Sequence, residues 1–183
     1  MELNMLKVES TALVIVDVQG KLAHQMHEKQ ALFENLRRMI RGAQALGLPI
    51  LWLEQLPDKL GATVPELAEL LTDLEPIPKS SFSACRNADF LAALKALARK
   101  QVLVVGIEAH ICVYQTATEL KDLNYQVEVV TDAISSRRAE NKHVALRKMN
   151  DCGVGLTSTE MALFELLGVA EGEQFKAILQ IVK

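Results

Sequence analysis

The segment from Gln101 to Glu119, QVLVVGIEAHICVYQTATE, predicts the central strand, turn and helix of this chain. It begins with an apolar run at 102–105, a pattern typical of a strand buried on both faces of a parallel sheet. Gly106 ends this run. After a short turn, small and apolar side chains recur at helical spacing, at Val113, Thr116, Ala117 and Leu120. A buried strand followed at once by a helix favours an α/β fold.

Cys112 is predicted to lie where this helix begins. A thiol at a helix N-terminus lies near the positive end of the helix dipole and near free N–H groups, which favours the nucleophilic thiolate. N–H groups of the same turn can hold a developing oxyanion. The alternative is an unreactive cysteine at a strand–helix junction, because free cysteine often fills small apolar sites. Its position alone leaves both interpretations open.

The length and composition indicate one domain, 1–183. Half of the 183 residues are hydrophobic, and the net charge of −3 favours neither a nucleic-acid nor an anionic-membrane partner. No apolar run is long enough to span a bilayer, and the first residues lack a signal-peptide pattern. Three cysteines are an odd and sparse set, which predicts a reducing cytoplasm rather than a disulfide framework.

Apolar runs alternate with helical patterns along the chain. Strands are predicted at 11–18, 49–53, 75–78, 102–105, 126–130 and 153–156. Helices are predicted at 30–46, after Pro65, at 88–98, after Cys112, and at 137–150, 158–167 and 175–182. This alternation predicts a three-layer α/β/α, Rossmann-like fold with a six-stranded parallel sheet in the order 3-2-1-4-5-6. Strands 1 and 4 then lie side by side and open a cleft at their carboxyl ends.

Asp17 interrupts the first apolar run close to its end. A carboxylate there is costly to bury without a partner, so it either caps the following turn or serves a site at the strand end. In the predicted sheet Asp17 and Cys112 share one cleft, where the carboxylate could accept the thiol proton. A nearby cation would lower the thiol pKa. The pattern alone does not identify that cation, since Lys79 in a loop is ordinarily solvated.

Three motifs in a fixed order carry a family resemblance. They are LVIVDVQ at 13–19, KSSFS at 79–83 and GIEAHICV at 106–113. From about Thr11 to Leu167 the sequence resembles the isochorismatase-like cysteine hydrolases, a superfamily of nicotinamidases, N-carbamoylsarcosine amidases and isochorismatases. The segments 106–120 and 132–137 are most similar to its isochorismatase-domain-containing branch.

The resemblance implies a catalytic triad at Asp17, Lys79 and Cys112. Asp17 would be the base, Cys112 the nucleophile, and Lys79 the cation that orients Asp17 and stabilises the thiolate. The family also has a non-proline cis peptide, which by position falls between Ile107 and Glu108. It would let the backbone N–H groups of Glu108 and Cys112 form an oxyanion hole.

The same resemblance implies the pocket and the assembly. Gln19, Phe82 and His110 occupy positions that line the family's substrate pocket. His110 lies two residues before Cys112, but in the family pattern it does not replace Asp17 as the base. A homo-oligomer is expected, with contacts from the later turns of the Cys112 helix and from 132–138.

Two differences between this sequence and other members of the superfamily narrow the range of expected activities. Metal-dependent nicotinamidases have Asp-x-His and a further histidine after the second strand, whereas 53–59 reads LEQLPDK here. His24 and His27 lie in a different loop, where two exposed histidines are the ordinary interpretation. We therefore expect no metal and no other cofactor. True isochorismatases lack the nucleophilic cysteine, so Cys112 counts against that reaction.

The sequence thus predicts a metal-independent cysteine hydrolase that cleaves a small amide or related C–N bond through a covalent thioester. Two alternatives remain open. One is a cysteine-dependent hydrolase of another bond, such as an ester. The other is a non-catalytic relative that keeps the fold as a binding or scaffolding module, although the three triad positions speak against it.

Overall fold

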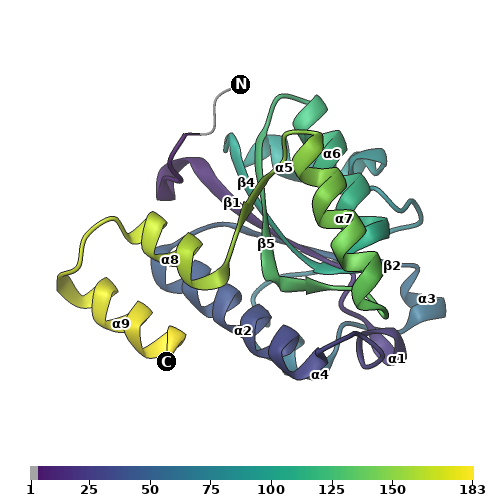
Figure 1. Ribbon diagram of the computed structural model, residues 1–183, viewed down its shortest axis with the longest axis horizontal. Helices are drawn as coiled ribbons and strands as arrows, with labels where there is room; N and C mark the ends of the chain where they lie inside the picture. The colour runs from purple at the N-terminus through teal and green to yellow at the C-terminus, as the bar shows by residue number, and fades with distance from the viewer. Residues whose placement is uncertain (1–3) are drawn as a thin grey trace.

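The computed structural model describes residues 4–183 and contains a six-stranded, all-parallel sheet (Figure 1). The strands are β1 (Thr11–Val16), β2 (Ile50–Gln55), β3 (Ile77–Lys79), β4 (Gln101–Ile107), β5 (Gln126–Ser135) and β6 (Gly155–Thr157). Their order, β3-β2-β1-β4-β5-β6, is the predicted one. The fold class is therefore confirmed.

The alternation of side chains along β1 divides the core into two layers. Leu13 and Ile15 belong to one apolar cluster, and Val14 and Val16 belong to the other, because successive strand residues point to opposite faces. The first cluster is covered by α1 (Gly20–Ala23), α2 (Lys29–Leu46), α4 (Pro65–Ala68), α8 (Thr159–Leu167) and α9 (Gly172–Val182).

The second cluster is covered by α5 (Ala88–Ala96), α6 (Tyr114–Asp122) and α7 (Ala139–Asp151), which lie together on the opposite face of the sheet (Figure 1). The short helix α3 (Pro57–Leu60) follows β2, and single 3₁₀ turns lie at Val8–Ser10 and Ala84–Arg86. The three layers are those expected when crossover helices cover both faces of a parallel sheet.

Several element ends near the site differ from the predicted ones, including those of β1 and β5. β1 ends at Val16 rather than at residue 18, because Asp17 takes a left-handed backbone conformation with φ 52°. β5 continues to Ser135, five residues past its predicted end, after an irregularity in its pairing with β4 between Val104 and Gly106. Sequence periodicity carries no signal for either feature, since both depend on the neighbouring strand.

The helix that carries Cys112 begins earlier than predicted. A π-helical turn at Ala109–Val113 precedes α6, with Glu108 as its N-terminal flanking residue. Cys112 therefore lies inside the first turn of a continuous helical segment rather than at its first residue. π-Turns of this kind often occur at functional sites.

Gly106 allows β1 and β4 to approach closely just before the site. Its φ is 115°, and a Cβ there would overlap the backbone oxygen and nitrogen of Val16. A side chain at this position is excluded both by backbone conformation and by space. The glycine that ends the apolar run in the sequence therefore sets the distance between the strands that carry Asp17 and Cys112.

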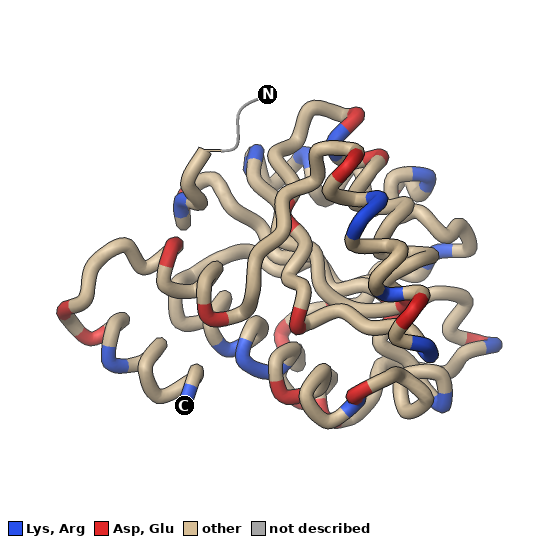
Figure 2. Tube along the Cα trace, in the orientation of Figure 1, with Lys and Arg blue, Asp and Glu red and all other residues tan. Residues whose placement is uncertain are grey.

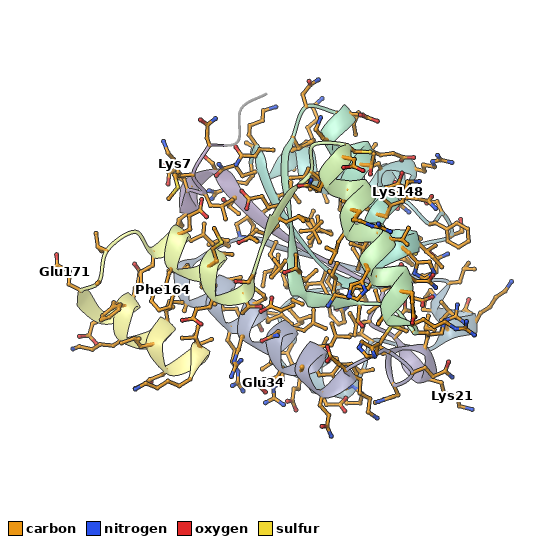
Figure 3. All side chains as sticks on the ribbon, viewed as in Figure 1. Lys7, Lys21, Glu34, Lys148, Phe164 and Glu171 are labelled. Atoms are coloured by element: carbon orange, nitrogen blue, oxygen red, sulfur yellow. The ribbon has the colours of Figure 1, made fainter. Side chains whose placement is uncertain are left out.

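Charged residues of both signs are spread over the outer helices and loops (Figure 2). Lys21 and Glu34 extend outward from α1 and α2, and Glu171 extends outward just before α9, whereas Lys148 of α7 lies 4.8 Å above the ring of Tyr114 on α6 (Figure 3). No helix within residues 4–183 is both long and apolar enough to cross a membrane.

Candidate active site

Four neighbouring strands end at one edge of the sheet and bring polar side chains together there. Lys79 is the last residue of β3 and pairs in register with Gln55, the last residue of β2. Asp17 directly follows β1, and Glu108 directly follows β4. In open α/β sheets this carboxyl edge, at the point where the chain reverses its direction of winding, is where ligands bind.

The Lys79 ammonium group is completely enclosed and surrounded by oxygen atoms. Its Nζ lies 2.7 Å from Asp17 Oδ2 and 2.6 Å from Gln55 Oε1. It also lies 3.1 Å from the carbonyl oxygens of Ser81 and Phe82. Four acceptors surround three N–H donors, so the hydrogen-bonding capacity of the ammonium is fully used. The lysine that a loop would ordinarily leave solvated is buried because β3 ends at it.

Asp17 uses its two carboxylate oxygens differently. Oδ2 accepts from Lys79, whereas Oδ1 is enclosed and accepts no hydrogen bond from residues 4–183. Burial raises the pKa of this carboxyl above its ordinary value, against the opposing effect of Lys79. A carboxylate with a raised pKa and one unused oxygen is suited to take a proton at neutral pH. Asp17 therefore does more than cap a turn.

Cys112 is buried and lies in the field of the same carboxylate. The pKa of its thiol is raised to about 12, chiefly by burial. The negative charge of Asp17 raises this pKa by more than the positive charge of Lys79 lowers it. Burial and the Asp17 charge thus oppose the stabilised thiolate expected from the sequence, and that expectation stays a prediction. Asp17 lies close enough to affect the thiol pKa and is the candidate acceptor for its proton.

Gln55 is a site residue that the sequence analysis did not single out. Its Oε1 accepts from Lys79, and its Nε2 donates to the carbonyl oxygen of Ser80 at 2.9 Å. The amide therefore connects the lysine to the loop that follows β3. Its position two residues after the predicted strand 49–53, near the carboxyl end of that strand, was the signal that could have identified it.

The three predicted pocket residues have different surroundings. Phe82 lines the cavity beside Cys112, and its side chain is 56% exposed at the rim. Gln19 is fully buried outside the cavity wall. Its Oε1 accepts from the Gln55 N–H at 2.6 Å, and its Nε2 donates to the carbonyl oxygens of Gln55 and Gly61. Gln19 thus ties the ends of β1 and β2 together with the α3 region.

His110 lies beside Cys112 in sequence but not in the cavity wall. Its Nδ1 lies 2.9 Å from Ser136 Oγ, and its Nε2 lies 3.4 Å from Asn141 Nδ2. One ring nitrogen therefore faces Ser136, which follows β5, and the other faces Asn141 in the first turn of α7. The structure brings Asp17, Lys79, Cys112 and Phe82 together and places Gln19 and His110 behind them.

A cavity of about 120 Å³ opens onto the thiol. Its polar lining consists of Asp17, Gln55, Glu108 and Cys112. Its apolar lining consists of Leu22, Leu60, Phe82, Ile107 and Ile111. This volume corresponds to about four water molecules at about 30 Å³ each, so it accommodates only a small reacting group.

The backbone around Glu108 has the features of an anion-binding turn. The Ile107–Glu108 peptide bond is cis. The Glu108 carbonyl accepts from the N–H groups of Ile111 and Val113, at 3.0 and 3.3 Å. The Glu108 N–H itself donates to no acceptor in the described part of the chain. A free N–H beside the cavity is the kind of donor that stabilises a developing oxyanion.

Glu54, a carboxylate near the end of β2, is used for hydrogen bonds within the protein. Glu54 Oε1 accepts from the backbone N–H and the hydroxyl of Thr63, at 2.7 and 2.8 Å, and that hydroxyl accepts from Trp52 Nε1. The carboxylate thus fixes the segment between α3 and α4. Within residues 4–183 no group of three His, Cys, Asp or Glu side chains has the arrangement of a metal site.

Comparisons with known proteins agree with this geometry. The Isochorismatase domain model matches residues 11–161. A curated relative, isochorismatase domain-containing protein 2 of Macaca fascicularis, is 36% identical over 178 residues, covering 95% of this chain and 83% of that protein.

Two solved structures have the same fold. The MAR1 ribonuclease from Caenorhabditis elegans superposes with a TM-score of 0.91 at 34% identity, covering 98% of this chain and 92% of that one. YcaC from Pseudomonas aeruginosa, solved with hexane-2,5-diol and covalent acrylamide, superposes with a TM-score of 0.92 at 25% identity, covering 99% and 93%. The predicted family is thus confirmed, and the chain belongs to the isochorismatase domain family.

Proposed function

We propose that this protein is a metal-independent cysteine hydrolase that cleaves a small amide or related C–N bond through a thioester. The observation that carries the proposal is that the two carboxylate oxygens of Asp17 differ. One accepts a hydrogen bond from Lys79, and the other is free beside the Cys112 thiol. The YcaC structure contains covalently bound acrylamide, so that protein of the same fold carries a group that reacts with a small amide.

The proposed reaction follows from these positions. Asp17 Oδ1 takes the thiol proton as Cys112 Sγ bonds to the carbonyl carbon, and the carbonyl electron pair moves to oxygen. The Glu108 and Cys112 N–H groups stabilise that oxyanion. When the C–N bond breaks, Asp17 returns the proton to the leaving nitrogen. Asp17 then removes a proton from water as the water oxygen attacks the thioester carbonyl carbon. The C–S bond breaks, Asp17 returns this proton to Cys112 Sγ, and the acid is released.

Lys79 would hold Asp17 in place throughout this cycle. Because its ammonium is saturated by four oxygens, it serves Asp17 rather than the substrate. Gln55 and Gln19 act as positioning residues behind it. No metal or organic cofactor takes part in the proposed reaction, and the three free cysteines are compatible with a reducing cytoplasm.

Trapping of the acyl-enzyme tests the proposal. The intact protein is incubated with a panel of small amides and matching esters, quenched in acid and weighed by mass spectrometry. A mass increase equal to the acyl group, located on Cys112 and missing in Cys112→Ala, is expected with amides. Adducts from esters alone would favour the ester hydrolase, and the absence of any adduct or turnover would favour a binding module.

RNA belongs in the same screen because the C. elegans relative is described as a ribonuclease. The net charge of −3 and the two carboxylates in the cavity weigh against an RNA phosphodiester substrate here. Cleavage of RNA by the wild-type protein that is lost in Cys112→Ala would contradict the proposed amide chemistry.

A further inference from the structure

Glu108 presents a carboxylate to the cavity that the proposed mechanism does not use. Its side chain is 6% exposed, and Oε1 accepts from the backbone N–H and the Nε of Arg137, both at 3.1 Å. Oε2 accepts from no donor among residues 4–183, and it is not one of the fully enclosed polar atoms. One oxygen is thus fixed by Arg137, and the other stays available beside the cavity.

The charges that line the cavity are all negative. Asp17 and Glu108 line it, whereas no lysine or arginine of the described chain does. The Lys79 ammonium beside Asp17 is fully enclosed and has all its donors used. Arg137 binds Glu108, and half of its side chain lies in solvent, where its charge is screened. A ligand beside the thiol therefore meets acceptor oxygens and no available cationic donor.

We propose that Glu108, held by Arg137, selects neutral or cationic substrates and excludes those that carry a carboxylate next to the reacting carbonyl. A carboxylate in this small cavity would lose its hydration and face like charges within a few ångström, which is costly in a partly dry site. A carboxamide or ammonium group can instead donate to Glu108 Oε2. The inference rests on the proposed function, because it names the substrate class of the same site.

Alkylation of Cys112 with reagents of different charge tests this without a known substrate. Iodoacetamide, iodoacetate and 2-bromoethylammonium are reacted separately with the folded protein at one pH, and modification of Cys112 is measured by peptide mass spectrometry. The same peptide in the urea-unfolded chain gives the intrinsic ratio of rates. Folding should increase the preference for iodoacetamide over iodoacetate about tenfold, the order expected for a like charge within a few ångström. The rate of Cys112 modification by 2-bromoethylammonium should also increase on folding relative to the rate with iodoacetate.

Glu108→Gln assigns the effect to this residue, because glutamine keeps an acceptor for Arg137 and removes the charge. The preference of folded Glu108→Gln for iodoacetamide over iodoacetate should be several-fold smaller than that of the wild-type protein. The preference that remains would be due to the charge of Asp17. Glu160→Gln, an exposed carboxylate on α8, is the matched control and should leave the ratios unchanged. If Glu108→Gln does not fold, the wild-type comparison still decides, since equal ratios in the folded and unfolded chains would overturn the inference.

The two proposals fail in different ways. Charge selection at Cys112 without any acyl-enzyme from amides or esters would reject the hydrolase and keep the inference about the cavity. Acyl-enzyme formation with anionic and neutral amides at similar rates would keep the hydrolase and reject the role of Glu108. Preference for iodoacetate would show that the Arg137 guanidinium, rather than Glu108, faces the ligand.

Discussion

Asp17 and Lys79 form an ion pair that is almost completely enclosed, with Oδ2 and Nζ 2.7 Å apart and side chains only 5% and 0% exposed. Charges buried in this way stabilise each other, but either one alone is strongly unfavourable. Each partner is therefore needed to keep the other in place, and the pair links β1 to β3 across β2.

Lys79→Met should destabilise the fold by about 3–5 kcal/mol, because it leaves Asp17 buried without a partner. Adding Asp17→Asn should restore part of the loss, since the uncompensated charge is removed. Urea unfolding of the single and double variants measures both effects. Lys176→Met is the matched control, because Lys176 lies the same 2.7 Å from Glu173 but both side chains are exposed. Equal losses for Lys79→Met and Lys176→Met would contradict the buried-pair interpretation.

Cys112→Ala should abolish turnover and leave the fold intact, because alanine fits the small space of the first helical turn. Deleting a nucleophile should lower kcat by at least about a thousandfold. Cys112→Ser should be nearly as inactive, since Asp17 is a weak base for a hydroxyl. Cys152→Ala, at an exposed position, serves as the control and should keep full activity. Substantial turnover by Cys112→Ala would remove the covalent mechanism.

The pH dependence should follow Asp17 on the acid side. Burial raises the pKa of this carboxyl above 3.8, and only the ionised form accepts the thiol proton. kcat/KM should therefore fall as the pH drops through that raised pKa. kcat/KM should not rise again near pH 8–9, where an ordinary thiol ionises, because the Cys112 pKa is about 12. A pH–rate profile that climbs with ordinary thiol ionisation would contradict proton transfer to Asp17.

The same pKa shift acts on stability in the opposite direction. A carboxyl whose pKa is higher in the folded than in the unfolded state favours folding most at low pH. That contribution decreases as the pH rises from 3.8 through the raised pKa of Asp17. Asp17→Asn should remove this slope in a comparison of unfolding free energies across the acid range. An unchanged slope would assign it to other carboxyl groups.

Turnover should not depend on a metal ion. In the proposed mechanism Asp17 activates the nucleophile and backbone N–H groups hold the oxyanion, so neither a metal-bound water nor a Lewis acid is needed. Dialysis against EDTA should leave kcat unchanged, and elemental analysis should find no stoichiometric metal. Activity that is lost on chelation and restored by zinc, iron or manganese would contradict the proposal and favour metal-dependent nicotinamidase chemistry.

A homo-oligomer is expected in solution. Apolar side chains remain exposed on the described surface, with Phe82 at 56% and Met161 at 61%. Later turns of α6 and the segment 132–138 are the expected contacts. Light scattering at micromolar concentration should give a mass that is a multiple of 20.2 kDa. A monomer under these conditions would contradict the expectation.

The sequence by itself determined the sheet and its order. Apolar runs, glycine stops and helical spacing are local signals, and right-handed crossovers leave few ways to connect them. The same signals placed Asp17 and Cys112 at the ends of neighbouring strands, and the family motifs added Lys79. The candidate catalytic residues could therefore be identified where they coincide with a strand end.

Only the tertiary structure decided how these groups act. The enclosure of Lys79 by four oxygens requires the ends of β1, β2 and β3 and the following loop, so no local pattern predicts it. The raised pKa of Cys112 depends chiefly on burial, which no local pattern predicts and which opposes the effect expected from its helix position. The role proposed for the Glu108 carboxylate also rests on folding, which places Arg137 on one of its oxygens and leaves the other without a donor in the described part of the chain.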